Sequence, residues 1–288
     1  MTASANFNVE IDDIEYGRHD GQSLQARLYL PQGDGPFPGV VEVHGGAWTG
    51  NDRLTNRDIH LPLAASGVTV MAIDFRMPPQ AQYPASIADI NLAVRWLKLH
   101  ASDLDVDPRL VGGLGTSSGG HQMMLSALKP RDPRYAMLPL PGAADIDASV
   151  TFVGLCWSIV DPLARYRMVQ GNGNHRLVQA HDAYWPSEAA MADGNPQLIL
   201  ERGEAQDLPP VLLIQGTNDD NVGPDMAQRF AATYRNSGGR ITLEVFDGQP
   251  HAFIAKDPTT PAALRAIRLI TEFVRRQTRR SGARLSFG

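Results

Sequence analysis

Hydrophobic and polar positions along the first 50 residues follow the two-residue period of β-strands. Three such segments, residues 11–18, 24–30 and 39–43, are separated by the turn-rich sequences HDGQ and PQGDGPFP. We expect an opening hairpin that leads into a buried strand.

Further along the chain, strand-like segments alternate with segments whose apolar residues have helical spacing. The predicted strands lie at residues 68–74, 110–114, 149–156, 211–215 and 241–246, and the predicted helices at residues 87–100, 119–128 and 261–276. This alternation predicts an α/β protein with a mostly parallel sheet and helices on both of its faces.

A long connection between the strand ending near Trp157 and the strand starting at Val211 has few strand signals. It contains several aromatic residues and the polar stretch GNGNH. A connection of this length is usually functional. We expect residues 162–206 to form a modest helical cap insertion between strands 6 and 7, over the C-terminal edge of the sheet, and residues 1–288 to form a single domain.

Composition and charge exclude several classes of protein. Hydrophobic residues make up 43% of the 288 residues and charged residues 20%, which excludes disordered and fibrous proteins. The net charge of −5 predicts no nucleic-acid partner and no membrane partner, and the arginine-rich tail after residue 274 is expected to be a solvated helix end. Because the N-terminal segment lacks a signal-peptide pattern and the single Cys156 cannot form an internal disulfide, we expect a cytoplasmic protein.

The most informative motif is GTSSG at residues 115–119, which follows a predicted apolar strand and opens a predicted helix. A nucleophile on a tight strand-to-helix turn needs small neighbours, and Gly115 and Gly119 supply that room. The positive end of the helix would face a developing oxyanion. We therefore predict Ser117 as a nucleophile. A dinucleotide-binding turn fits less well because its third glycine is missing, and no phosphate loop or HExxH metal motif occurs.

The segment HGGAW at residues 44–48 follows the third predicted strand. Its two glycines permit a backbone that turns amides toward a common point, as in the oxyanion loops of hydrolases with a nucleophile on such a turn. We predict that the amides of Gly46, Ala47 and Ser118 form an oxyanion hole.

Ser117 needs a base, and such hydrolases place the residues in the order Ser, acid, His along the chain. Four histidines lie downstream of Ser117. His251 follows the last predicted strand in the loop FDGQPHAF and is our predicted base. His121 lies in the helix behind the nucleophile, and His175 and His181 lie in the predicted cap.

The acid must follow a strand between Ser117 and His251 in the chain. The segment VLLIQGTNDDNV at residues 211–222 offers two adjacent carboxylates. We predict Asp219 as the acid that fixes the imidazole tautomer and stabilises its charged form. Asp220 is the alternative, and Asp161 is a third candidate.

In their order and spacing, HGGAW, GTSSG, the GxxD turn at residues 216–219 and PHAF resemble the α/β-hydrolase carboxylesterases of the hormone-sensitive-lipase and feruloyl-esterase-like branches. The likeness runs from Val9 to Arg276. The resemblance implies an α/β-hydrolase fold with an eight-stranded sheet, no cofactor, and ester hydrolysis through an acyl-enzyme. Ala47 stands where HGGG has its third glycine, which is closer to the arylformamidase and feruloyl-esterase-like variants, and the two-helix N-terminal cap of the hormone-sensitive-lipase group is not expected.

We therefore predict a carboxylesterase that cleaves a small-molecule ester through Ser117, His251 and Asp219. Two alternatives stay open: an amide-bond hydrolase on the same triad, such as an arylformamidase or a peptidase, and a ligand-binding receptor without catalysis. A homodimer also stays open. The candidates for a substrate pocket are aromatic residues, a class that is often buried in cores as well. They are Trp48, Trp157, Tyr166 and Trp185.

Overall fold

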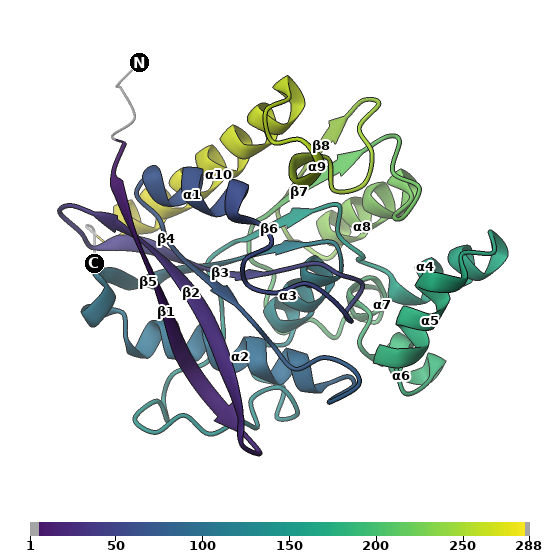
Figure 1. The fold of residues 1–288 in the computed structure, drawn as a ribbon, viewed down its shortest axis with the longest axis horizontal. Helices are drawn as coiled ribbons and strands as arrows, with labels where there is room; N and C mark the ends of the chain where they lie inside the picture. Colours follow the sequence, from purple (N-terminus) through teal and green to yellow (C-terminus); the bar gives the residue numbers. More distant parts are fainter. Residues whose placement is uncertain (1–5, 286–288) are drawn as a thin grey trace.

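The computed structural model describes residues 6–285, with side chains as far as residue 278, and Figure 1 shows its strands and helices. The strands are β1 (Asn8–His19), β2 (Gln22–Gln32), β3 (Phe37–Val43), β4 (Thr69–Ile73), β5 (Val106–Thr116), β6 (Val153–Cys156), β7 (Val211–Gly216) and β8 (Ile241–Phe246). The helices are α1 (Arg57–Ala65), α2 (Ala85–Leu99), α3 (Ser118–Leu128), α4 (Pro162–Gly171), α5 (His175–Tyr184), α6 (Glu188–Asp193), α7 (Pro196–Glu201), α8 (Pro224–Asn236), α9 (Phe253–Lys256) and α10 (Pro261–Leu285), with a 3-10 turn at Ser102–Leu104.

All of these strands belong to one sheet, in the order β1-β2-β4-β3-β5-β6-β7-β8. The hairpin strands β1 and β2 pair antiparallel, and β2 also runs antiparallel to β4. Every other pair is parallel. The sheet is therefore mixed, and the expectation of an eight-stranded, mostly parallel sheet with helices around it is confirmed.

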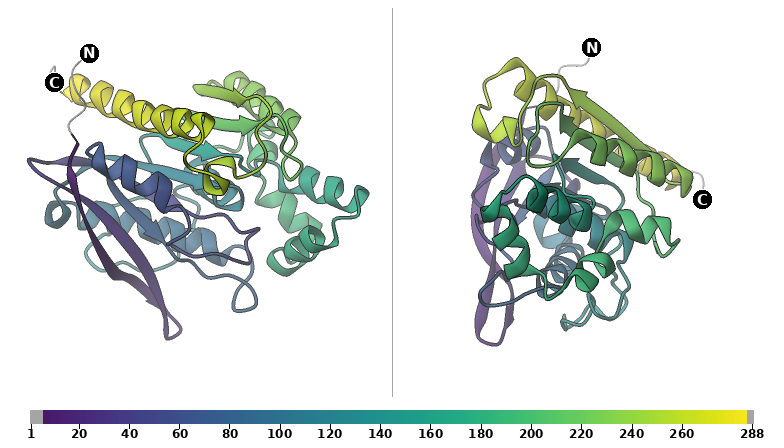
Figure 2. Two further views of the ribbon diagram at one scale, coloured as in Figure 1. Left: turned by 45° about the horizontal axis from the view of Figure 1, so that its top comes forward. Right: turned by 90° about the vertical axis from the view of Figure 1, so that its right-hand side faces the viewer.

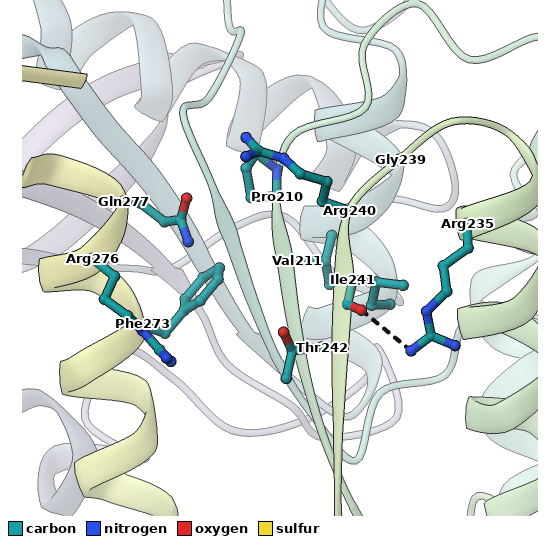
Figure 3. Close-up of a pocket in the computed structure, with 10 residues that line it drawn as sticks. All are labelled: Pro210, Val211, Arg235, Gly239, Arg240, Ile241, Thr242, Phe273, Arg276 and Gln277. Atoms are coloured by element: carbon teal, nitrogen blue, oxygen red, sulfur yellow. Dashed lines mark hydrogen bonds between the residues drawn. The ribbon is translucent and has the colours of Figure 1, made fainter. Parts of the chain in front are cut away.

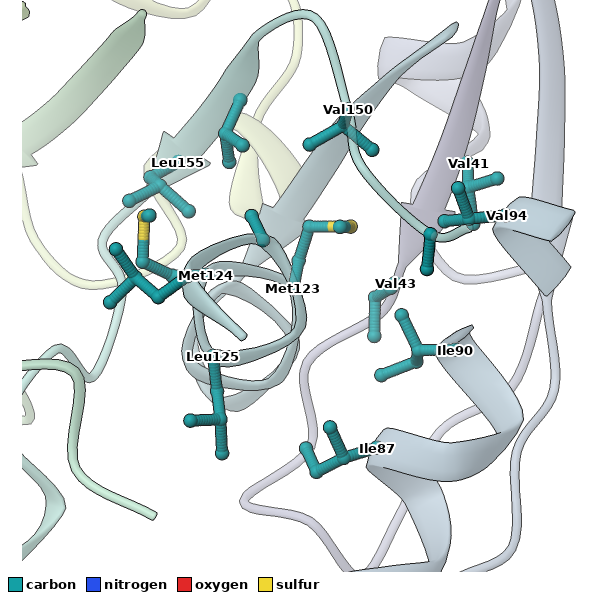
Figure 4. Packing of buried hydrophobic residues seen from close by; sticks show 14 of the residues in the cluster. Val41, Val43, Ile87, Ile90, Val94, Met123, Met124, Leu125, Val150 and Leu155 are labelled. Atoms are coloured by element: carbon teal, nitrogen blue, oxygen red, sulfur yellow. The ribbon is translucent and has the colours of Figure 1, made fainter. Parts of the chain in front are cut away.

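Alternate residues of the central strands face two separate hydrophobic cores. On β3, Val41 and Val43 join the core that contains α2 and α3, whereas Val40 joins the core that contains α1 and α10. Figure 4 shows the first core, where Val41 and Val43 lie near residues of α2 and the methionines of α3. Because both faces of the sheet are covered, the central strands are mainly apolar on both sides, as parallel strands usually are, with the buried Glu42 of β3 as an exception.

Most predicted elements are confirmed, but several boundaries were wrong. The strand predicted at residues 149–156 begins only at Val153, where it pairs with Val211. Pro209 and Pro210 precede β7 and have no amide hydrogen, so the β6–β7 pairing cannot extend to earlier residues. Helices α1 and α8 were not predicted. Pro62 lies inside α1 and weakens its helical pattern.

The long connection after β6 is helical, as the sequence predicted. Helices α4, α5 and α6 gather at one end of the molecule, at the right of Figure 1 and facing the viewer in the right-hand view of Figure 2. Helix α7 instead packs against α3 and α8, beside the sheet. The division into a single domain with a cap at residues 162–206 stays a prediction.

Two predictions concern chain ends that lie partly outside the described residues. Residues 1–5 of the N-terminal segment and residues 286–288 of the arginine-rich tail are outside the description. Within residues 6–285, no helix combines the length and the apolar character that a membrane crossing needs.

Leu213 in the middle of β7 offers a test of the packed core. Its side chain is fully buried in the core that contains α3 and α8 residues, and α8 packs against β7. We predict that Leu213→Ala lowers the free energy of unfolding by about 2 to 5 kcal/mol, because truncation leaves a cavity. Urea denaturation measures the change. Val245→Ala on β8, where the side chain is 43% exposed, should cost less than about 1 kcal/mol, and an equal loss in the two variants would contradict this packing.

Candidate active site

Ser117 lies on the turn between β5 and α3, in a backbone conformation that side-chain-bearing residues rarely adopt. Its φ is 52° and its ψ is −120°. Glycines around it allow close approach of the backbone: a Cβ on Gly119 would lie 2.1 Å from the Val43 carbonyl oxygen, and a Cβ on Gly120 would lie 1.8 Å from Ser158 Oγ. The predicted role of Gly119 agrees with this geometry, and Gly120 is a further requirement that the sequence reasoning missed.

Ser117, His251 and Asp219 come together from the ends of three different strands. Ser117 Oγ lies 3.0 Å from His251 Nε2, and His251 Nδ1 lies 2.9 Å from Asp219 Oδ2 and 3.1 Å from Oδ1. An ionised carboxylate only accepts hydrogen bonds, so Nδ1 carries the hydrogen of a neutral imidazole. Nε2 is then the acceptor for the Ser117 hydroxyl.

Asp219 is held by its own loop as well as by His251. Its Oδ1 accepts hydrogen bonds from the amides of Asn221 at 2.9 Å and Val222 at 2.8 Å, and its Oδ2 accepts one from Gln215 Nε2 at 3.0 Å. Burial alone would raise the pKa of the carboxyl, but the hydrogen bond from His251 and these further donors outweigh it, so the pKa lies below its usual value. Asp219 is therefore ionised at neutral pH.

The two alternative acids occupy other positions. Asp220 is exposed to solvent. Asp161 caps α4, where its Oδ1 accepts a hydrogen bond from the amide of Ala164 at 3.0 Å and another from Asn195 Nδ2 at 2.8 Å. Neither of these aspartates contacts His251 among the recorded hydrogen bonds of the described residues.

The other downstream histidines do not approach Ser117 Oγ with a hydrogen bond. His121 is fully buried, accepts a hydrogen bond from Trp48 Nε1 at 3.1 Å, and lies 2.8 Å from the Gly194 carbonyl oxygen through Nε2. Burial lowers its pKa to about 4. His175 is exposed at the first position of α5, and His181 accepts a hydrogen bond from Arg165.

The HGGAW loop lies against the first turn of α3. Gly46 has a φ of 121° and Ala47 a φ of 53°, and a Cβ on Gly46 would lie 2.1 Å from the Gly50 carbonyl oxygen. The Trp48 amide donates to Ser118 Oγ at 3.1 Å, which ties the loop to the helix. No protein acceptor is recorded for the amides of Gly46 and Ala47 in the described part of the chain. As the first residue of α3, Ser118 has no intrahelical acceptor for its amide.

Ser117 lines a cavity of about 430 Å³, and His251 and the HGGAW loop line the same cavity. Of the four aromatic candidates, Trp157 lines this cavity and Trp48, Tyr166 and Trp185 do not. Trp48 and Trp185 pack in a buried aromatic cluster, where the Trp48 ring stacks on Tyr184 with centroids 5.4 Å apart. The Tyr166 hydroxyl donates to Asp182 at 2.7 Å.

The cavity has two positively charged lining residues, Arg165 from α4 and Arg176 from α5. Its recorded lining contains no Asp or Glu. The sequence reasoning missed both arginines, because nothing in the pattern of residues 162–206 distinguishes a residue that faces the cavity from one that faces solvent. Asn221, two positions after Asp219, was missed as well; it lines the cavity and donates its amide to the acid.

A second cavity of about 440 Å³ lies at the opposite ends of β7 and β8, where Val211 and Ile241 begin these strands (Figure 3). Three arginines line it, and one of them, Arg235, donates to the Ile241 carbonyl at 3.2 Å. None of its lining residues is Ser, Cys, His, Asp or Glu. The groups that hydrolysis requires are therefore at the Ser117 cavity and not here.

Two solved structures similar to this one are those of esterases. The hyperthermophilic esterase of Pyrobaculum calidifontis aligns with a TM-score of 0.78 and 21% identity over 96% of this chain and 88% of that one. An esterase of Thermogutta terrifontis aligns with a TM-score of 0.72 and 24% identity over 93% of each chain. At these identities the likeness establishes the α/β-hydrolase fold that the motifs implied.

Similarity in sequence extends to curated proteins and to a family model. The chain is 30% identical over 225 residues to the probable carboxylic ester hydrolase LipM of Mycobacterium tuberculosis, covering 77% of this chain and 50% of that protein. It is 27% identical over 244 residues to the esterase LipC of the same organism, covering 83% and 59%. The chain spans about half the length of these curated relatives. The BD-FAE family model matches residues 27–234, and this chain belongs to the BD-FAE family.

Proposed function

We propose that the chain is a carboxylesterase that cleaves a small-molecule ester through an acyl-enzyme on Ser117. The observation that carries the proposal is the hydrogen-bonded triad of Ser117, His251 and Asp219 at a cavity. The backbone amides of Gly46 and Ala47, which also line this cavity, have no recorded acceptor among residues 6–285. The esterase names of the similar proteins support the same reaction.

The first half of the reaction forms the acyl-enzyme. Ser117 Oγ attacks the acyl carbon while its proton passes to His251 Nε2, 3.0 Å away. The amides of Gly46, Ala47 and Ser118 donate to the oxyanion that develops on the carbonyl oxygen. His251 then gives its proton to the leaving alcohol, which departs and leaves the acyl group on Ser117.

The second half repeats these steps with water as the nucleophile. His251 takes a proton from water, the hydroxide attacks the acyl carbon, and the same amides hold the second oxyanion. Collapse of this intermediate returns the proton to Ser117 and releases the acid. Asp219 remains ionised throughout and stabilises the imidazolium that forms in each half.

The remaining predictions on organisation and location are proposals as well. We propose residues 162–206 as a cap, because α4 and α5 supply Arg165, Arg176 and Leu177 to the lining of the cavity. The absence of nucleic-acid and membrane partners, the cytoplasmic location and the homodimer stay predictions. Cell fractionation and light scattering of the purified protein test the last two.

Replacement of the nucleophile is the first test. We predict that Ser117→Ala lowers the turnover of p-nitrophenyl acetate by a factor of about 10⁴ or more, because the acyl-enzyme cannot form. Spectrophotometric release of p-nitrophenol measures the rate. The matched control Ser102→Ala, at an exposed serine that does not line the Ser117 cavity, should keep the wild-type rate. Near-wild-type activity in Ser117→Ala would contradict the proposal.

Replacement of the acid is the second test. We predict that Asp219→Asn lowers kcat by a factor of about 10³ to 10⁴, because the amide neither fixes the required tautomer nor stabilises the imidazolium. Steady-state kinetics on the same ester, with circular dichroism to check folding, measures the effect. Asp220→Asn is the control, because Asp220 is the exposed neighbour. A larger loss in the control than in Asp219→Asn would mean that the acid is misassigned.

A further inference from the structure

We propose that the Ser117 cavity selects an ester that carries a carboxylate. Arg165 is the residue that binds this carboxylate, and the exposed Arg176 attracts it from the edge of the cavity. This inference rests on the proposed esterase function and adds a substrate class to it. It is carried by a buried guanidinium that lines the cavity and has no recorded carboxylate partner in the described residues.

Arg165 is a fully buried cation with unused donors. Its side chain makes three recorded hydrogen bonds: Nε donates to the Asn221 carbonyl oxygen at 3.3 Å, Nη2 donates to Asn221 Oδ1, and Nη1 donates to His181 Nε2 at 2.9 Å. A guanidinium has five N–H donors. One N–H on each terminal nitrogen is therefore left without a recorded partner, on a residue that lines the cavity.

The partners of Arg165 offer no counter-charge, although its guanidinium carbon lies over the Trp48 ring, 5.9 Å from the ring centroid. Asn221 is neutral, and His181 must be neutral because its Nε2 accepts from the guanidinium. Burial, together with the charge of Arg165, lowers the pKa of His181 to about 2. Asp219 lowers the electrostatic cost of the cation, but its carboxylate accepts a hydrogen bond from His251 Nδ1 at 2.9 Å and makes no recorded hydrogen bond or ion pair with Arg165.

The guanidinium nevertheless stays charged at neutral pH. Burial, with a smaller contribution from nearby Arg176, lowers the pKa of Arg165 to about 10. Buried charges are normally paired, because removal of an ion from water without a counter-charge is costly. An anionic ligand in the cavity would supply the counter-charge that the described residues do not.

Arg176 adds a second positive charge to the same cavity. It is exposed on α5, lines the cavity, and takes part in none of the ion pairs recorded for the described residues. Both arginines line the same cavity, and the charge of Arg176 contributes to the lowered pKa of Arg165. The recorded lining contains these two cations and no Asp or Glu, so the charges on its surface favour an anion over a cation.

A carboxylate is the anion that fits these donors. Two parallel N–H groups of a guanidinium match the two oxygens of a carboxylate, and such charge-assisted pairs are strong in a site shielded from water. Arg95 is also buried without a carboxylate, but it donates to Asn91 and to the Leu138 carbonyl and does not line the Ser117 cavity. Its place in the lining of the Ser117 cavity is what gives Arg165 a role in selecting substrate.

Arg165 also holds Asn221, whose amide donates to Asp219. Loss of Arg165 can therefore disturb the acid loop and slow the hydrolysis of every ester. A test must separate this positioning effect from binding of the substrate carboxylate. The ratio of activities on an anionic ester and a matched neutral ester does so, because a disturbed triad lowers both rates alike.

The experiment compares kcat/KM for two such pairs. Mono-p-nitrophenyl adipate and p-nitrophenyl hexanoate differ only at the far end of the acyl group, and 4-acetoxybenzoate and phenyl acetate differ on the alcohol side. We expect the wild-type protein to favour the anionic member of at least one pair by about tenfold or more. In Arg165→Gln this ratio should fall to about one or below, and in Arg165→Lys it should be intermediate, because a lysine keeps the charge but loses the paired donors.

Two further variants sharpen the comparison. Arg176→Gln should lower the anionic-to-neutral ratio by a few-fold, with an effect that weakens at high salt, because the side chain is exposed. Arg167→Gln is the matched control on the same helix, since Arg167 is 67% exposed in its side chain and does not line the cavity. This control should leave the ratio unchanged.

Binding of free adipate, measured by isothermal titration calorimetry, provides a readout that does not require turnover. We expect adipate to bind wild-type protein and Ser117→Ala, and to bind Arg165→Gln at least tenfold more weakly. A wild-type protein that hydrolyses the neutral esters as fast as the anionic ones and does not bind adipate would overturn the inference while leaving the esterase proposal intact. A preference that survives in Arg165→Gln would also overturn it. Failure of the esterase proposal is distinct: no ester is hydrolysed, whatever the result with adipate.

Discussion

The close approach of the first turn of α3 to the end of β3 is the constraint on which the site depends. Gly119 lies so near the Val43 carbonyl oxygen that any side chain at this position would collide with it, and only glycine fits. This contact holds the strained backbone of Ser117 at the end of β5. It also brings Ser118 Oγ to the amide of Trp48, so the same contact places the oxyanion loop. The nucleophile and its proposed oxyanion donors are thus fixed by one packing arrangement.

The parallel strands of the sheet position Asp219 and His251, the other two residues of the triad. Strands β5 and β7 run in the same direction, so Ser117 and the Asp219 loop lie at the same edge, and the loop after β8 brings His251 between them. Each partner then restrains the next, because Asp219 is held by Asn221 and Val222 and in turn holds the imidazole. Placement of the reacting atoms therefore follows from backbone geometry more than from side-chain packing.

This dependence explains what the sequence could predict. Strand periodicity and the GTSSG turn are local signals, and the order of the strands places Ser117, Asp219 and His251 at one edge without knowledge of any contact. Helix α8 was not predicted, although its buried residues have the spacing of one helix face. Its sequence pattern was therefore sufficient to predict it. The start of β6 was misplaced because two prolines precede its partner strand β7 and end the pairing there. That limit is visible only once it is known that β6 pairs with β7.

The surroundings of the triad could not be predicted in the same way. Trp48 follows the oxyanion loop in sequence, yet its ring is turned into a buried cluster with Tyr184. Arg165 lines the cavity, whereas Arg167 on the same helix is exposed to solvent. Which of these two arginines faces the cavity depends on how α4 packs over the end of the sheet, and a single sequence contains no signal for that orientation.

Direct capture of the acyl-enzyme tests the central claim about Ser117. The protein is mixed with a p-nitrophenyl ester, quenched in acid within the first turnovers, digested and examined by tandem mass spectrometry. The account predicts an acyl group on Ser117 in the wild-type protein and none in Ser117→Ala. An acyl group on another residue, or ester turnover in Ser117→Ala at the wild-type rate, would contradict it.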